Sequence, residues 1–257
     1  MTNSEATEYL RIGIANKQYP THLFQYRTIE ICKLILENNT MKFSSPKEFN
    51  DPFDCQIVPD TENTFEQVVS FLNENNFYNL SVPQIKNLAE DTMKTPEKWK
   101  NTIEQTFDKI INATGVCCFT KEENNLLMWS HYTNSHKGVC LKFNVLKDLD
   151  FFVIPFPVKY SDQYPTYNHL IDRTTLVNDM VLTKSKIWEY ENEIRVIKLN
   201  KTGYINFKKD ALEEIVFGCN TTDQEINEIK NLALKHDYNI IFKKANKKQR
   251  QFGLEII

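Results

Sequence analysis

Short strand-like runs at both ends of the chain enclose a long stretch with helical periodicity, and this order limits the folds open to it. Within residues 60–112, apolar side chains recur at helical spacing, as Phe65, Val68 and Leu72 do. Outside that stretch, apolar residues come in short β-rich runs bounded by turn formers. We therefore expect one α+β domain over residues 1–257, with a mixed, largely antiparallel sheet and a helical insertion near residues 60–112.

The individual elements follow from the same spacing. Capping boxes at Thr64 with Gln67 and at Thr222 with Glu225 each open a helix. Further helices are predicted at residues 28–39, 83–93, 96–111 and 167–182. Two prolines in the strand at residues 151–160 suggest an edge or a bend. The other predicted strands cover residues 23–27, 41–44, 115–119, 138–143, 193–198, 204–207, 214–217, 238–242 and 252–257.

Composition excludes several classes of protein. Hydrophobic residues make up 41% of the 257 residues, which is enough for a substantial core. No apolar stretch approaches the roughly 20 residues of a membrane helix, and the first residues have neither the basic start nor the apolar core of a signal peptide. We therefore expect a cytoplasmic protein without a membrane partner. The 6 cysteines form no C-x-x-C pair and are interpreted as reduced.

Charge and glycine content narrow the choice of ligand. The net charge of -3 gives no global field that would attract nucleic acid or anionic lipid. The one basic cluster, at residues 243–250, is interpreted as a solvated turn between two terminal strands. Neither G-x-x-x-x-G-K-[ST] nor G-x-G-x-x-G occurs, so phosphate binding by a P-loop or a Rossmann loop is not expected.

Two polar motifs lie in the first quarter of the chain. Tyr26 and Arg27 end the first predicted strand, where the guanidinium could bind a phosphate or carboxylate with two hydrogen bonds. Asn50, Asp51 and Asp54 follow in a proline-containing turn. Backbone capping by the aspartates is the favoured interpretation of this second motif, and its side chains are otherwise pocket candidates.

A third motif combines aromatic, imidazole and ammonium groups directly before a strand. The segment 129–138 suits a pocket that stacks a flat ring and attracts an anion. Core packing is the favoured role of Trp129 itself, whereas Tyr132 and His136 slightly favour a ligand pocket. The cofactor-binding candidates in this motif are Trp129, Ser130, Tyr132, His136 and Lys137.

A fourth motif carries charges that alternate along a predicted strand. If residues 188–197 are extended, then Glu191, Glu193 and Arg195 point to one face of the sheet. A solvated ion pair would explain such a face. The alternative is a pair of carboxylates at a cleft, with Arg195 keeping one of them ionised.

The four motifs together resemble the bacterial domain-of-unknown-function family 2971. The resemblance spans about residues 23–218 and implies no activity by itself. The order of the parts is also similar, more distantly, to the ADP-ribosyltransferase superfamily. There, an early strand carries His or Arg, a middle region supplies aromatic and hydroxyl groups, and a late strand supplies a glutamate.

This second resemblance implies a split sheet and an enzyme that cleaves the nicotinamide–ribose bond of NAD. Glu193 would stabilise the oxocarbenium-like state, and Glu191 would position or deprotonate the acceptor. Arg27, with Lys137, would hold the pyrophosphate, and Tyr132 would stack on nicotinamide. Tyr26 and Arg195 would complete the site. NAD would be consumed as a substrate without a metal. The acceptor would be a protein, a nucleic acid or a small molecule, in a toxin or phage-defence setting.

Three alternatives remain at this point. A metal-dependent phosphodiesterase would use Asp51, Asp54, Glu191 and Glu193 as oxygen ligands. A non-catalytic sensing module of a defence system would use the same pocket only for binding. Catalysis by a cysteine nucleophile, Cys118 or Cys55 paired with His131 or His136, is disfavoured because adjacent strand cysteines are usually buried and inert.

Overall fold

The computed structural model describes residues 3–76, 78–171 and 174–257. The chain divides into two compact units. Unit 1 comprises Met1–Ser45, Thr114–Val158 and Ile187–Ile257, and unit 2 comprises Pro46–Ala113 and Lys159–Lys186. That residues 1–257 form one domain stays a prediction.

Unit 1 is built on a sheet in which eight strands are ordered β14-β13-β12-β5-β1-β4-β10-β6. Strands β12 and β13 pair in parallel, and the other neighbours pair antiparallel. This mixed, mostly antiparallel sheet with its helices confirms the predicted α+β class. The strands are β1 (His22–Arg27), β4 (Gly115–Thr120), β5 (Val139–Asn144), β6 (Pro155–Pro157), β10 (Glu193–Lys198), β12 (Leu212–Phe217), β13 (Ile241–Lys247) and β14 (Leu254–Ile256).

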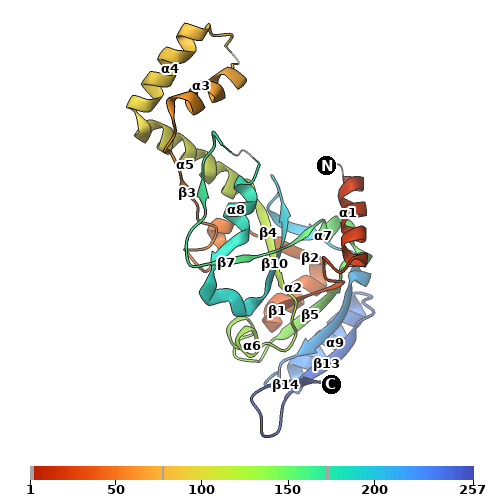
Figure 1. The fold of residues 1–257 in the computed structure, drawn as a ribbon. Coiled ribbons are helices and arrows are strands. Elements are labelled where there is room, and N and C mark those ends of the chain that lie inside the picture. Colours follow the sequence, from red (N-terminus) through yellow and green to blue (C-terminus); the bar gives the residue numbers. More distant parts are fainter. Residues whose placement is uncertain (1–2, 77, 172–173) are drawn as a thin grey trace. The chain divides into compact units, whose positions relative to one another are not determined.

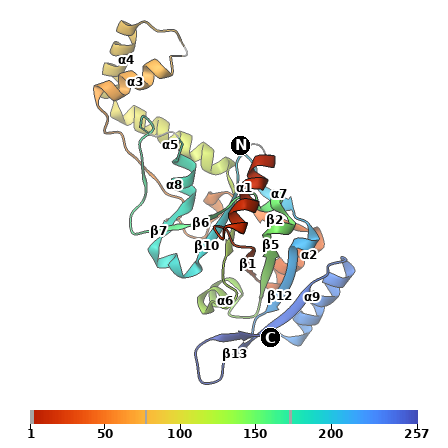
Figure 2. The ribbon, with the colours of Figure 1, turned by 45° about the vertical axis from the view of Figure 1, so that its right-hand side comes forward.

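Helices cover this sheet and bury two apolar clusters. The larger cluster joins sheet residues to α1 (Asn3–Ala15), α2 (Ile29–Asn38), α7 (Leu149–Phe152) and α9 (Asp223–Lys235). Figures 1 and 2 show α9 running alongside β13. The smaller cluster lies where α6 (Leu126–Tyr132) packs against the side chains of Tyr26, Cys140 and Val216. A separate antiparallel pair in unit 1 joins β2 (Thr40–Phe43) to β11 (Gly203–Asn206).

Unit 2 contains the helices predicted for residues 60–112. They are α3 (Phe65–Glu74), α4 (Val82–Lys94) and α5 (Pro96–Ala113), and α8 (Leu176–Leu182) comes from the later segment. In Figure 1, α3 and α4 lie side by side. Two short parallel pairs complete the unit: β3 (Val58–Pro59) with β8 (Thr166–Tyr167), and β7 (Lys159–Ser161) with β9 (Thr183–Ser185).

The two capping boxes predicted from sequence are present. The Thr64 hydroxyl accepts from the backbone N–H of Gln67, and the Gln67 side chain accepts from the backbone N–H of Thr64. Thr222 and Glu225 make the same reciprocal pair at the start of α9. Each box satisfies backbone donors that a helix N-terminus otherwise leaves unpaired. The helices therefore begin where the local sequence predicts.

Three predicted elements were wrong in extent. Residues 151 and 152 of the predicted strand 151–160 belong to the short helix α7, and Val153 then reverses the chain with a φ of 45°. The prolines do place β6 at the sheet edge, as expected. The helix predicted over 167–182 begins only at residue 176, and residues 172–173 lie outside the described part. The last long strand starts at residue 241 instead of 238 and includes part of the basic cluster, so the exposed turn begins at Lys248.

Three helices of unit 1 were not predicted: α1, α6 and α7. In α1, Ala6, Leu10 and Ile14 are buried at a spacing of four residues. Apolar residues at this spacing lie on one face of a helix, so the sequence itself indicates α1. Among the described residues, none of the helices has both the length and the apolar character needed to span a membrane. All six cysteines are free of disulfides, and Cys32, Cys55, Cys117 and Cys140 are buried.

Candidate functional site

Three of the four polar motifs belong to unit 1. The first, third and fourth motifs fall on β1, α6 with the turn after it, and the start of β10. Strand β4 lies between β1 and β10, and its Thr120 is in register with Phe24 on one side and Glu193 on the other. The topology therefore brings these motifs to neighbouring strands.

Tyr26 is a core residue at the centre of this region. Its side chain is 2% exposed, and its ring meets that of Trp129 edge-on at 5.1 Å between centroids. The hydroxyl donates to the carbonyl of Glu122 (3.0 Å) and accepts from the backbone N–H of Asn125 (3.3 Å). Burial raises the pKa of Tyr26 well above its usual range. Tyr26 thus holds the connection that leads from β4 into α6.

Arg27 ends β1 and is half-buried beside the third motif. Its guanidinium donates to the carbonyl of Tyr26 (3.1 Å). Burial lowers the pKa of Arg27, while Cys117, Cys118 and Tyr132 favour its charged form. Arginine titrates so far above neutral pH that the group stays cationic. Arg27 therefore places a positive charge next to the Tyr132 phenol.

A side chain bridges β1 and β4 next to this charge. The amide of Gln25, which is 2% exposed, donates to the carbonyl of Cys118 (2.9 Å) and to the Cys117 sulfur (3.4 Å). Burial raises the pKa of the Cys117 thiol to about 11. That thiol is therefore protonated near neutral pH and unsuited to act as a nucleophile. Gln25 was not among the predicted site residues.

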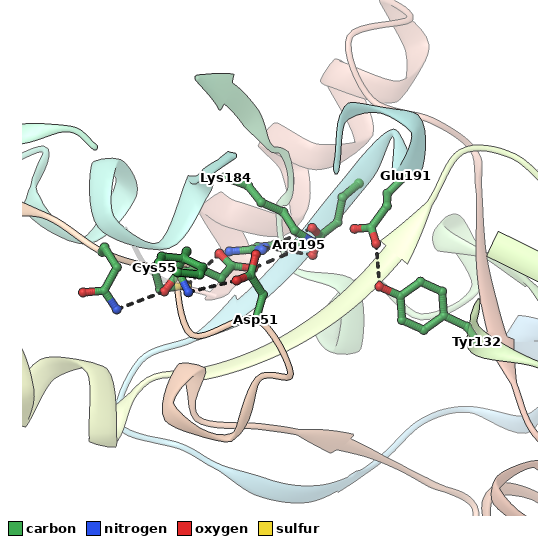
Figure 3. Close-up of polar contacts among 10 residues, drawn as sticks. Asp51, Cys55, Tyr132, Lys184, Glu191 and Arg195 are labelled. Carbon is green, nitrogen blue, oxygen red and sulfur yellow. Dashed lines mark hydrogen bonds and ion pairs between the residues drawn. The ribbon is translucent and has the colours of Figure 1, made fainter. Parts of the chain in front are cut away.

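Helix α6 presents Tyr132 to the fourth motif. Asn125 caps the helix by accepting from the backbone N–H groups of Leu127 (3.0 Å) and Met128 (3.2 Å). Trp129 is fully buried, and its indole N–H donates to the carbonyl of Glu123 (2.9 Å), so it anchors the helix in the core. Three residues on, the half-buried Tyr132 donates its hydroxyl to Glu191 at 2.5 Å, as Figure 3 shows.

A tight left-handed turn follows α6. Asn134, Ser135 and His136 all have positive φ, between 49° and 65°. The His136 ring stacks in parallel on Trp129 with centroids 6.4 Å apart, and burial followed by the charge of Lys247 lowers its pKa. A Cβ at Gly138 would lie 2.2 Å from the carbonyl oxygen of Arg27, so only glycine permits this approach.

The remaining candidates of the third motif face solvent. Ser130 and Lys137 are both exposed, whereas Tyr132 and His136 are half-buried. Of the predicted cofactor contacts in this segment, Tyr132 is the one brought against both a cation and a carboxylate. Roles for Ser130, His136 and Lys137 in ligand binding stay predictions.

The fourth motif is not one continuous strand, as the alternation suggested. Glu191 ends a 3-10 helix over Lys186–Glu191, and Asn192 has a φ of 45°, so β10 begins at Glu193. Glu191 therefore does not share the strand face of Glu193. It turns to Tyr132 instead. The prediction that three charges point together was wrong for Glu191, because a left-handed residue breaks the period of two.

Glu193 and Arg195 do share a face, and they form a buried ion pair. The guanidinium donates from Nε to one carboxylate oxygen (2.9 Å) and from a terminal nitrogen to the other (3.1 Å). Glu193 is 5% exposed and Arg195 is 0% exposed. Such a bidentate pair fixes both side chains and offsets the charge of each.

Further hydrogen bonds connect the segment before α6 to the segment before β10. The Asn125 amide donates to the carbonyl of Tyr190 (2.6 Å), and the Tyr190 hydroxyl pairs with Nδ1 of His131 (3.1 Å). Asn192 donates to the carboxylate of Glu122 (3.2 Å). Together with the Tyr132–Glu191 bond, they hold the third and fourth motifs as one assembly.

The second motif belongs to unit 2 and has a local structural role. Asp51 accepts from the backbone N–H of Phe53 (2.9 Å), which confirms the predicted capping turn. Asp54 is 6% exposed, and its carboxylate lies 3.8 Å from the ammonium of Lys184. Asn50 is exposed. Over residues 3–76, 78–171 and 174–257, no group of three or more His, Cys, Asp or Glu side chains is arranged to hold a metal ion.

The segment that carries the Tyr132–Glu191 bond also matches a family model. Residues 128–196 match DUF2971, a family described as a protein of unknown function. The DUF2971 match includes the third and fourth motifs but not Arg27, and it is shorter than the resemblance expected over residues 23–218. No curated protein matches the chain, and neither does a solved structure. The likeness to ADP-ribosyltransferases therefore stays a hypothesis.

Proposed function

We propose that this protein is an ADP-ribosyltransferase-like enzyme that binds NAD and cleaves its nicotinamide–ribose bond. The observation that carries the proposal is the 2.5 Å hydrogen bond from Tyr132 to Glu191, made by a phenol that also neighbours the Arg27 guanidinium. A cation, an aromatic ring and a carboxylate from separate motifs thus meet in unit 1. Each of these groups could contact a different part of NAD: its diphosphate, its nicotinamide ring or its ribose.

The chemistry assigns one role to each group. Arg27 would pair with the diphosphate, because guanidinium groups bind phosphate oxygens with fixed, charge-assisted hydrogen bonds. The half-buried ring of Tyr132 would stack against the nicotinamide. Glu193, held in place by Arg195, would accept from a ribose hydroxyl and stabilise positive charge on the ribose.

The bond changes balance without a further reactant. The bond between the ribose carbon C1′ and the nicotinamide nitrogen breaks, and its electron pair leaves with neutral nicotinamide. The resulting oxocarbenium-like carbon is attacked by a nucleophile of the acceptor. Glu191 would take the proton from that nucleophile, and the Tyr132 hydroxyl would orient its carboxylate.

The test is release of nicotinamide from NAD by the purified 257-residue chain, with a cell lysate as the source of acceptors. We expect the wild type to release nicotinamide and Glu193→Gln to be slower by at least about 100-fold, because a neutral amide stabilises positive charge poorly. Glu255→Gln is the matched control, since Glu255 is an exposed residue of β14. Melting curves establish that each variant is folded.

Two other outcomes would each support a different function for this protein. Saturable NAD binding without release of nicotinamide would favour the non-catalytic sensing module. Activity on a phosphodiester that requires added Mg²⁺ or Mn²⁺ and disappears with a chelator would favour the metal-dependent alternative. Equal release by the wild type and Glu193→Gln would remove Glu193 from the mechanism.

A further inference from the structure

The hairpin of β13 and β14 ends in an exposed turn that none of the four motifs uses. The backbone N–H of Lys248 closes this turn by donating to the carbonyl of Gly253 (3.0 Å). All residues from 247 to 252 are exposed. Figures 1 and 2 show the loop between the two strands projecting away from the sheet. The side chains of the turn are therefore available to a partner in solution.

The base of the hairpin is fixed, so the turn is held in one place. Ala245 of β13 and Leu254 of β14 are buried in the smaller apolar cluster, which also contains Trp129. Burial and, after it, the charge of Lys247 lower the pKa of His136. The hairpin thus lies beside the third motif without being part of it.

The hairpin carries positive charge that the rest of the chain leaves uncompensated. Five of residues 242–254 are basic and none is acidic. The two that lie deeper in β13 are each within 4.0 Å of a carboxylate: Lys243 with Glu214 and Lys244 with Asp223. The three nearest the turn, Lys247, Lys248 and Arg250, have no carboxylate partner in the described part of the chain. Such a local group of cations attracts a polyanion although the whole chain is acidic.

A fully exposed aromatic ring lies in the same turn. Phe252 was predicted to begin the last strand, but β14 starts at Leu254, so the ring belongs to the turn with the cations. Its side chain is 104% exposed. Proteins that bind unpaired nucleic acid combine these two features, because cations follow the phosphates while an aromatic ring stacks on a base.

The polar composition of the turn favours a nucleic acid over a membrane. A lipid surface is bound by a wide apolar face with cations around it. Here a single apolar ring lies next to Gln251 and two positions from Arg250, so its insertion into lipid would bury polar groups without partners. The same polar groups suit nucleic acid, because glutamine and arginine donate to base edges and phosphates.

We propose that the turn of the β13–β14 hairpin binds single-stranded nucleic acid. Phosphates would pair with the three uncompensated cations, and one unpaired base would stack on the ring of Phe252. These contacts use groups that DNA and RNA share, so the test includes both. The proposal goes beyond the proposed NAD chemistry and does not depend on it.

The test is fluorescence anisotropy of labelled oligonucleotides of about 12 nucleotides, a length that one such site can hold. The probes are oligothymidine, oligouridine and a DNA duplex of equal length, each titrated with the 257-residue chain. We expect both single strands to bind more tightly than the duplex, whose bases are already stacked. Attraction to charge alone would favour the duplex, which has more phosphates per unit length.

Phe252→Ala and Phe252→Leu isolate the stacking contact. Each should weaken binding of the single strands by at least about fivefold, because leucine restores an apolar side chain but no flat ring. Tyr204→Ala is the matched control, since it removes an exposed ring from β11 and should leave the affinity unchanged. Melting curves show that each variant is folded.

The salt dependence isolates the cations. Three phosphate contacts predict that log K falls with log salt concentration with a slope of about −2 for a single strand. Changing Lys247, Lys248 and Arg250 together to Gln should bring this slope close to zero. Lys86→Gln, at an exposed position of α4, is the control and should keep the slope of the wild type.

Three results would overturn the proposal. The first is no binding of either single strand by the folded wild type at low salt. The second is a duplex bound at least as tightly as the single strands, with Phe252→Ala unchanged, which is attraction to charge alone. The third is cosedimentation with vesicles of phosphatidylserine and phosphatidylcholine that Phe252→Leu preserves, without binding of oligonucleotides. None of these results bears on release of nicotinamide, so the two proposals succeed or fail separately.

Discussion

Glu191 and Glu193 are two positions apart but have different partners, because Asn192 between them is left-handed. Asn tolerates positive φ better than other residues with a side chain, and a β-branched residue there would cost roughly 1–2 kcal/mol. The turn sends Glu191 to Tyr132 and leaves Glu193 on the strand with Arg195. One backbone angle therefore separates the carboxylate that would handle the acceptor from the one that would face the ribose.

Tyr132→Phe tests the link between the third and fourth motifs. It removes the hydroxyl that donates to Glu191, a carboxylate that is 3% exposed, so we expect a loss of about 1–2 kcal/mol in the free energy of unfolding. Nicotinamide release should fall by about tenfold or more, because the Glu191 carboxylate is no longer oriented. Urea unfolding and the release assay measure the two effects. Tyr204→Phe, at a side chain 70% exposed, should change neither.

Arg195→Met tests the buried ion pair. It leaves the Glu193 carboxylate buried without its guanidinium, and we expect the free energy of unfolding to fall by about 3–5 kcal/mol. The double variant Glu193→Gln, Arg195→Met should lose at least about 1 kcal/mol less than the sum of the two single variants. Additive losses in a urea-unfolding cycle would show that the two side chains are not coupled.

At the scale of elements, local signals explain where helices begin but not how distant segments meet. The boxes at Thr64 and Thr222 are complete within four residues, so the sequence predicts them directly. By contrast, Asn125 caps α6 and also donates to Tyr190, a partner far along the chain that no local pattern identifies. Sequence reasoning accordingly located α3 and α9 but missed Asn125 and Gln25.

A second cluster of bonds fixes the start of β12. Glu213 accepts from His22 (3.0 Å), Asn144 (3.0 Å) and Lys147 (2.8 Å), which ties β12 to the neighbouring ends of β1 and β5. Burial alone would raise the pKa of Glu213, but these bonds outweigh it and lower the pKa to about 2.

A lowered pKa in the folded state means that this carboxylate stabilises the fold above its unfolded pKa of about 4.3 and stops doing so as the pH falls toward about 2. We expect Glu213→Gln to be less stable than the wild type by about 1 kcal/mol at neutral pH, a modest value because the side chain is partly exposed. This difference in the free energy of unfolding should disappear as the pH falls from about 4.3 toward about 2. Urea unfolding at several pH values measures it, and a gap that is constant with pH would contradict the assignment.

At the scale of the whole molecule, the order of motifs along the chain only partly predicted their grouping. Three of the four motifs lie in unit 1, and there the pairing of β4 with both β1 and β10 brings them to adjacent strands. The Asn50–Asp54 turn lies in unit 2, which is assembled from two separated segments. Such long-range assembly has no signature in local periodicity, so the division into units was not predicted.

The most direct test of the central claim is a crystal structure of Glu193→Gln with NAD, a variant in which turnover should be too slow to consume the ligand. We expect the diphosphate within hydrogen-bond distance of Arg27, the nicotinamide against Tyr132 and its ribose facing residues 191 and 193. NAD bound elsewhere on unit 1 or on unit 2, or a crystal without NAD at saturating concentration, would contradict the claim that these three motifs form one site.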